Sequence, residues 1–157
     1  MFQIGDYVCY PMHGVGTVES IEEQTVLGET SKYYLLRFTY NRMTAMIPVS
    51  NADAVGLRSL SSYDECIEAI RFLQDDSTLA ESDNWNQRYR ENLDKLRNGN
   101  IFDVAHVVKA LMRRDKEKGL SAGERKMYQT ARQVLVAELS ISTKIENDVL
   151  MSLVGAE

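Results

Sequence analysis

Trp85 is the single tryptophan of this chain, and basic side chains follow it closely. Arg88, Arg90, Lys95 and Arg97 all lie within the next four turns of a predicted helix. A large flat apolar ring flanked by guanidinium groups can wedge against nucleic-acid bases while the cations bind phosphates. The alternative is ordinary packing, because most large aromatic side chains serve the core. On these residues alone, packing is the more common outcome.

Side chains that could support catalysis do not form a recognisable set. His13 lies beside turn glycines and His106 lies on the polar side of a predicted helix; neither has a partner at metal-ligand spacing. The carboxylate pairs Asp64–Glu65 and Asp75–Asp76 are adjacent in sequence and so do not face each other on a helix. Gly14–Gly16 is too short to cradle a phosphate. We therefore expect no enzymatic activity, no metal and no cofactor.

The charge distribution separates one basic segment from an acidic chain. The 157 residues carry a net charge of −5, yet residues 84–126 hold 11 basic and 6 acidic side chains, a net charge of +5. Residues 1–83 hold 5 basic and 13 acidic side chains, a net charge of −8. A solvated helix face also collects charge, so this asymmetry is compatible with a polyanion partner without requiring one.

Composition indicates a globular protein of the cytoplasm. Hydrophobic residues make up 44% and charged residues 26% of the chain, which is ordinary for a soluble domain. No apolar run approaches the ~20 residues of a membrane span, and the first residues do not resemble a signal peptide. Cys9 and Cys66 lie far apart without a Cys-x-x-Cys spacing, so we expect reduced thiols.

The first part of the chain reads as short β-strands joined by tight turns. The expected strands alternate apolar and polar residues or are rich in β-branched and aromatic residues; they are 6–10, 16–21, 33–38, 43–49 and 55–58. Five short strands are too few for a sandwich and predict a small open barrel.

From Ser61 onward the apolar period becomes helical. Capping boxes at 62–65 and 121–124 predict two helix starts, and Gly99 predicts the end of the helix that begins at Asn84. Further helices are expected around an apolar stripe from Val104 to Met112 and near 143–146. The fold class is therefore α+β with two domains, a β domain over residues 1–59 and a compact all-α domain over residues 60–157.

Three motifs follow one another in the chain: GDYVCYPMHGVG at residues 5–16, NWNQRYRENL at residues 84–93 and RRDKEKGLSAGE at residues 113–124. In this order they resemble the CarD/CdnL family of bacterial transcription regulators. The resemblance extends over essentially the whole chain. The first motif alone would also fit the polymerase-binding module of transcription-repair coupling factors.

The resemblance implies a Tudor-like or SH3-like β domain that docks on the lobe of the RNA polymerase β subunit. It implies also a helical domain that contacts promoter DNA, without sequence specificity, at the upstream edge of the transcription bubble. The family tryptophan enters the minor groove there and hinders collapse of the bubble. Carried over by position, the DNA-binding residues are Trp85, Arg88, Arg90, Arg114, Arg125 and Lys126.

The expected polymerase contacts lie in the β domain at Gln24, Thr44, Ala45, Met46 and Ile47. Some family members carry basic residues where this chain has Gln24 and Met46, so docking here would depend more on pairing at a strand edge. We expect a monomer that associates with the nucleoid through polymerase. The alternative is a protein–protein adaptor that does not bind DNA, in which Trp85 would be buried or contact protein.

Overall fold

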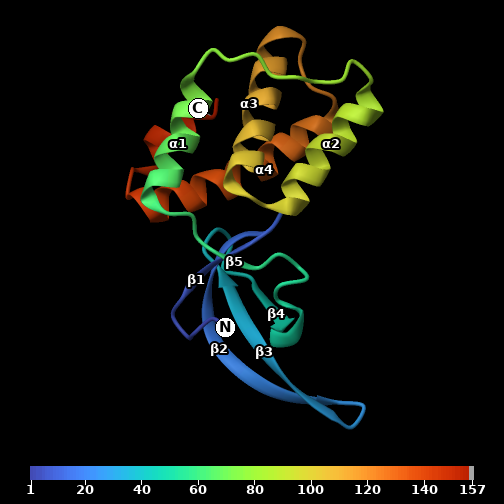
Figure 1. The fold of residues 1–157 in the computed structure, drawn as a ribbon, viewed down its shortest axis with the longest axis vertical. Helices are drawn as coiled ribbons and strands as arrows, with labels where there is room; N and C mark the ends of the chain where they lie inside the picture. Colours follow the sequence, from blue (N-terminus) through green and yellow to red (C-terminus); the bar gives the residue numbers. More distant parts are fainter. Residues whose placement is uncertain (156–157) are drawn as a thin grey trace.

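The computed structural model describes residues 1–155. An antiparallel β domain and a helical domain lie end to end along the longest axis of the molecule (Figure 1). Every strand precedes every α-helix in the sequence. This arrangement confirms the predicted α+β class, with a small β domain first and a compact helical domain second.

The β domain is one sheet of five antiparallel strands in the order β4-β3-β2-β1-β5. The elements are β1 (Tyr7–Tyr10), β2 (Gly14–Val26), β3 (Glu29–Phe38), β4 (Thr44–Pro48), the 3-10 helix η1 (Val49–Asn51) and β5 (Arg58–Ser59). Alternate residues Tyr34, Leu36 and Phe38 of β3 are buried, as a half-covered strand requires. β4 and β5 are the edges of the sheet.

The β2–β3 hairpin is longer than the sequence pattern indicated, and it projects from the rest of the sheet (Figure 1). Residues 22–26 and 29–33 pair in register, although nearly all of their side chains are exposed. The turn explains the extension, because Leu27 (φ 53°) and Gly28 (φ 81°) both take the positive φ that matches strand twist. Because these residues bury neither face of the hairpin, their sequence lacks the apolar alternation that predicts a strand.

Up to residue 155, the second domain consists of five α-helices. They are α1 (Tyr63–Gln74), α2 (Trp85–Asn98), α3 (Ile101–Glu117), α4 (Ala122–Thr143) and α5 (Asn147–Leu153). Both predicted capping boxes are present, at Ser62 with Glu65 and at Ser121 with Glu124. Gly99 ends α2 with φ 76°, as predicted from its type. The core of this domain is formed mainly by α1, α3 and α4.

The polar connector between α1 and α2 is fixed by two basic residues of α3. Lys109 is fully buried, lies over the Phe72 ring, and donates to the carbonyl of Phe72 and the carboxylate of Asp75. Arg113 donates to the carbonyls of Asp75, at 3.0 Å, and of Ser77. These contacts hold the start of the connector, from Phe72 to Ser77, against α3.

Candidate functional site

Trp85 is the first residue of α2, and the protein covers its side chain only in part. The residue is 43% exposed. Tyr89, one turn later, stacks on the indole with ring centroids 5.1 Å apart and planes 20° apart. Trp85, Tyr89, Leu93 and Leu96 lie on one apolar stripe of α2, in which Leu93 is half-buried and Leu96 is 3% exposed. The apolar stripe therefore rises out of the core toward the start of α2 and ends in an accessible aromatic stack.

Glu124 fixes the orientation of the indole. Trp85 Nε1 donates to Glu124 Oε1 at 3.2 Å and to Ser121 Oγ at 3.3 Å. The same carboxylate accepts from the backbone N–H of Ser121 and so closes the capping box of α4. Its other oxygen lies 3.4 Å from Arg88 Nε. One side chain, 3% exposed, therefore joins the starts of α2 and α4.

Glu124 remains ionised in this buried position. Burial alone would raise the pKa of its carboxyl group, but hydrogen bonds from Ser121 and the charge of Arg88 outweigh that effect and hold the pKa below its ordinary value. The sequence identified Glu124 only as a helix cap. Its contact with Trp85 was missed, because 39 residues separate the two and no local pattern connects them.

Basic side chains from α3 and α4 lie close to this stack. Arg114 approaches Glu124 to 3.9 Å, and Arg125 lies 3.4 Å from Asp115 with a side chain 53% exposed. Lys126 is exposed and lines, with Tyr89, a hollow of about 200 Å³ floored by Leu93 and Met127. The partial positive charges at the N-termini of α2 and α4 add to these cations.

Arg90 is exposed on α2, one residue beyond Tyr89. Within residues 1–155, no hydrogen bond or ion pair engages its side chain. We group Trp85, Tyr89, Arg90, Arg114, Arg125 and Lys126 under the name tryptophan face. Its composition suits a polyanion that also offers flat rings.

Arg88 does not belong to the tryptophan face, contrary to the expectation from its motif. It is 3% exposed, its Nε faces Glu124, and its NH1 donates to the carbonyl of Ser82 at 3.2 Å. A phosphate cannot reach this guanidinium without unfolding the start of α2. Helical spacing alone places Arg88 beside the apolar stripe, but the neighbouring α4 covers that side.

The expected polymerase-binding residues lie on and beside the edge strand β4. Gln24 of β2 and Met46 of β4 are both exposed, and Gln24 Nε2 lies 3.6 Å from Met46 Sδ. These two side chains therefore form one continuous surface across β3. Thr44 is exposed and Ala45 is half-buried, which leaves this end of the edge strand accessible.

Ile47 does not present its side chain to a partner. It is 4% exposed and packs in the core of the β domain with residues such as Tyr34, its neighbour in register on β3. Strand alternation explains the difference, since successive residues of β4 point to opposite faces of the sheet. Ile47 therefore contributes no side-chain contact to the docking surface.

The described residues offer no group of three or more His, Cys, Asp or Glu side chains placed to hold a metal ion. His106 is half-buried and stacks on Phe72 at 6.1 Å, so it lies less on a polar surface than expected. Cys9 and Cys66 are both free thiols and buried. None of the helices described is long and apolar enough to cross a membrane.

Two family models account for almost the whole chain. The model described as “CarD-like/TRCF RID domain” matches residues 2–61, and the model described as “CarD, C-terminal domain” matches residues 68–154. The chain belongs to the CarD family. Both matches agree with the motif resemblance seen in the sequence.

A curated relative extends this CarD-family match over most of both chains. “Putative transcription factor YdeB” of Bacillus subtilis (strain 168) is 42% identical over 144 residues, which cover 90% of this chain and 92% of the relative. Two solved structures from Myxococcus xanthus match 38% of this chain. The solution NMR structure of the 72-residue N-terminal domain of CarD has 29% identity, 79% coverage of that chain and a TM-score of 0.34. The structure described as CdnLNt has 42% identity, 83% coverage of that chain and a TM-score of 0.33.

Proposed function

We propose that this CarD-family protein is a transcription regulator that binds the RNA polymerase β subunit and stabilises the promoter open complex. Residues 1–59 would form the polymerase-binding domain and residues 60–157 the DNA-contacting domain. Trp85 would wedge at the upstream fork of the bubble, and Arg90, Arg114, Arg125 and Lys126 would contact phosphates. The observation that carries this proposal is the accessible Trp85 ring, held in one orientation by Glu124 beside exposed cations.

The contribution of a single aromatic contact sets the size of the expected change in open-complex population. Stacking of one base on one aromatic ring contributes about 1–3 kcal/mol. If that contact exists only in the melted state, it shifts the population roughly five- to a hundredfold toward the open complex. No covalent chemistry is required.

Polymerase docking supplies what the tryptophan face lacks. Four phosphate contacts without base readout would not locate promoters in a genome. Tethering to polymerase raises the effective concentration of the wedge at the fork. The surface formed by Gln24 and Met46, with the accessible edge at Thr44 and Ala45, suits pairing with a strand of the β lobe.

The deciding experiment compares open-complex lifetimes with purified polymerase alone, with this protein and with Trp85→Ala. We expect the wild-type protein to lengthen the lifetime, and Trp85→Ala to lose most of that effect while binding polymerase equally well. Trp85→Phe, which retains a smaller ring, should be intermediate. Full lifetime extension by Trp85→Ala with intact polymerase binding would instead support a protein–protein adaptor.

A further inference from the structure

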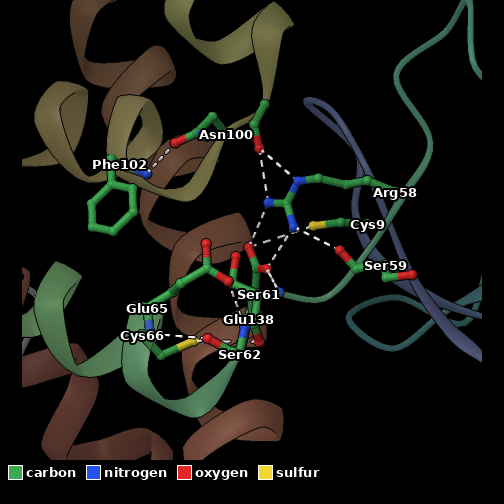
Figure 2. A network of polar contacts seen from close by, with 11 residues as sticks. Cys9, Arg58, Ser59, Ser61, Ser62, Glu65, Cys66, Asn100, Phe102 and Glu138 are labelled. Carbon is green, nitrogen blue, oxygen red and sulfur yellow. Dashed lines mark hydrogen bonds and ion pairs between the residues drawn. The ribbon is translucent and has the colours of Figure 1, made fainter.

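Glu138 of α4 is a buried carboxylate at the junction of the two domains. It is 2% exposed, and both of its oxygens accept hydrogen bonds from Arg58 of β5 at 2.7 Å (Figure 2). The backbone N–H of Ser61 donates to Oε2 at 2.7 Å, and the Cys9 thiol lies 3.7 Å from Oε1. One carboxylate therefore binds two strands and the connector that leads to α1.

Arg58 also binds the end of the helix that carries Trp85. Its Nε and NH2 donate to the carbonyl of Gly99 at 3.1 Å and 2.8 Å. Gly99 is the C-cap of α2, and Trp85 is the first residue of the same helix. A single guanidinium group thus joins the sheet to α4 and to the far end of α2.

The backbone around this ion pair is tightly packed. Gly99 has φ 76°, and a Cβ added there would lie 2.6 Å from Cγ of Pro11, in the turn between β1 and β2. On α4, Gln133 Nε2 donates to the hydroxyl of Tyr40 at 2.8 Å. The sheet therefore contacts α2 and α4 at several points, and the Arg58–Glu138 pair lies among them.

We propose that Arg58 and Glu138 are positioning residues, which fix the direction of α2 relative to the sheet and thereby place Trp85 at the fork when the β domain is docked. This role rests on the proposed function. The 14 residues of α2 span about 20 Å. A rotation of roughly 10° at Gly99 would displace Trp85 by ~3–4 Å, about the spacing of one nucleotide along a strand.

The chemistry of the pair favours a directional role over simple adhesion. A buried ion pair often stabilises a fold no better than apolar side chains of similar size. A guanidinium fork that binds a carboxylate with two bonds and a carbonyl with two more defines an angle, which apolar packing does less sharply. The planar guanidinium of Arg58 directs N–H donors to the carboxylate and to the carbonyl at the same time. The ammonium group of a lysine has no such fixed geometry.

Two variants test the role without deleting a side chain. Arg58→Lys keeps the charge and loses the fork, while Glu138→Gln keeps the size and loses the charge. Arg71→Lys is the matched control, because Arg71 pairs with Glu68 within α1 on the exposed surface. Arg58 is 26% exposed, so Arg58→Lys is the milder change and serves if Glu138→Gln fails to fold.

The first readout is the distance between the domains. Spin labels on Ser50→Cys in η1 and Gln129→Cys in α4 sit on exposed positions, and the buried Cys9 and Cys66 should not react. We expect one narrow distance distribution for the otherwise wild-type protein and for Arg71→Lys. Arg58→Lys and Glu138→Gln should broaden or shift it. A distribution that stays narrow and unshifted in both variants would overturn the proposal.

The second readout is the split between docking and open-complex lifetime. We expect Arg58→Lys to bind polymerase within about twofold of wild type and to lose at least threefold of the lifetime extension. A broadened distance distribution with full extension would also overturn the positioning role. If Trp85→Ala itself lengthens the open-complex lifetime as much as the wild-type protein, the proposed function fails. In that case the distance measurement alone decides whether the Arg58–Glu138 pair sets the angle between the domains.

Discussion

Trp85 Nε1 and Glu124 Oε1 are joined by a hydrogen bond of 3.2 Å that connects the first turn of α2 to the first turn of α4. With Tyr89 stacked on the other side, the indole is held in one orientation although it is 43% exposed. An aromatic side chain that is already ordered loses little conformational freedom when it binds. The same bond gives a specific way to disturb the ring without removing it.

Glu124→Gln should destabilise the helical domain by about 3 kcal/mol, because it leaves the buried Arg88 charge unpaired. The measurement is the free energy of unfolding in urea. Glu65→Gln is the matched control, since Glu65 closes the same kind of capping box on α1 but is exposed. Equal losses in the two variants would show that only the cap matters.

Trp85 is the sole tryptophan, so its fluorescence reports directly on the tryptophan face. In the free protein we expect acrylamide to quench the emission, because the ring is partly exposed. In a complex of polymerase with fork-junction DNA, quenching should fall. An emission that acrylamide does not reach in the free protein would contradict the structure.

Arg90→Ala and Arg125→Ala should each lower the salt dependence of complex formation by about one unit of log K against log salt, as expected for one phosphate contact. Titrations of polymerase–promoter complexes over a range of salt concentration measure this slope. Arg97→Ala, at an exposed position near the opposite end of α2, is the control and should leave the slope unchanged. An unchanged slope for Arg90 and Arg125 would remove them from the DNA surface.

Met46→Ala and Ile47→Ala should separate docking from folding. Ile47 is 4% exposed, so its truncation should cost about 2–4 kcal/mol of stability. Met46 is 39% exposed, and its truncation should leave the melting temperature nearly unchanged while it weakens polymerase binding. Thermal melts and a polymerase pull-down distinguish the two effects. If both variants bind polymerase as well as the wild-type protein, the docking surface lies elsewhere.

Acid should loosen the junction between the domains. Burial opposes ionisation of Glu138, but the hydrogen bonds and charge of Arg58 outweigh it and hold the pKa of Glu138 below its ordinary value of 4.5. The ionised group therefore stabilises the fold fully above pH 4.5, and that contribution is lost as the pH falls below it. Unfolding free energies between pH 7 and pH 3 measure this loss. Glu138→Gln should make the unfolding free energy depend less on pH over this range. If the variant depends on pH as steeply as the wild-type protein, other carboxylates are responsible.

The sequence predicted those features that are encoded locally. Capping boxes and the glycine after Asn98 located helix ends to within a residue or two. Alternation located most strands that have one buried face. It missed residues 22–26 of β2, whose side chains are exposed on both faces, and the start of β2 at Gly14 and Val15, which was expected to be a turn. The last strand was expected at 55–58 and lies at Arg58–Ser59, where pairing with β1 decides its position.

Features that depend on contacts between distant helices were beyond the sequence pattern. Arg88 is buried because it pairs with Glu124, which lies 36 residues away in the sequence. Helical spacing within α2 does not indicate this pairing. Ile47 faces the core because of the register between β3 and β4. In the sequence pattern Glu138 is an ordinary polar residue of a long helix, but in the structure it accepts hydrogen bonds from Arg58 and Ser61.

The contact between Arg58 and Glu138 also orders events during synthesis. Glu138 follows Arg58 by 80 residues, so at about 5–20 residues per second the arginine waits ~4–16 s for its partner to be translated. All five strands, and with them Gln24 and Met46, are translated by Ser59, before any residue of α4. If that surface binds polymerase as proposed, a chain interrupted in that interval would present it without an ordered Trp85.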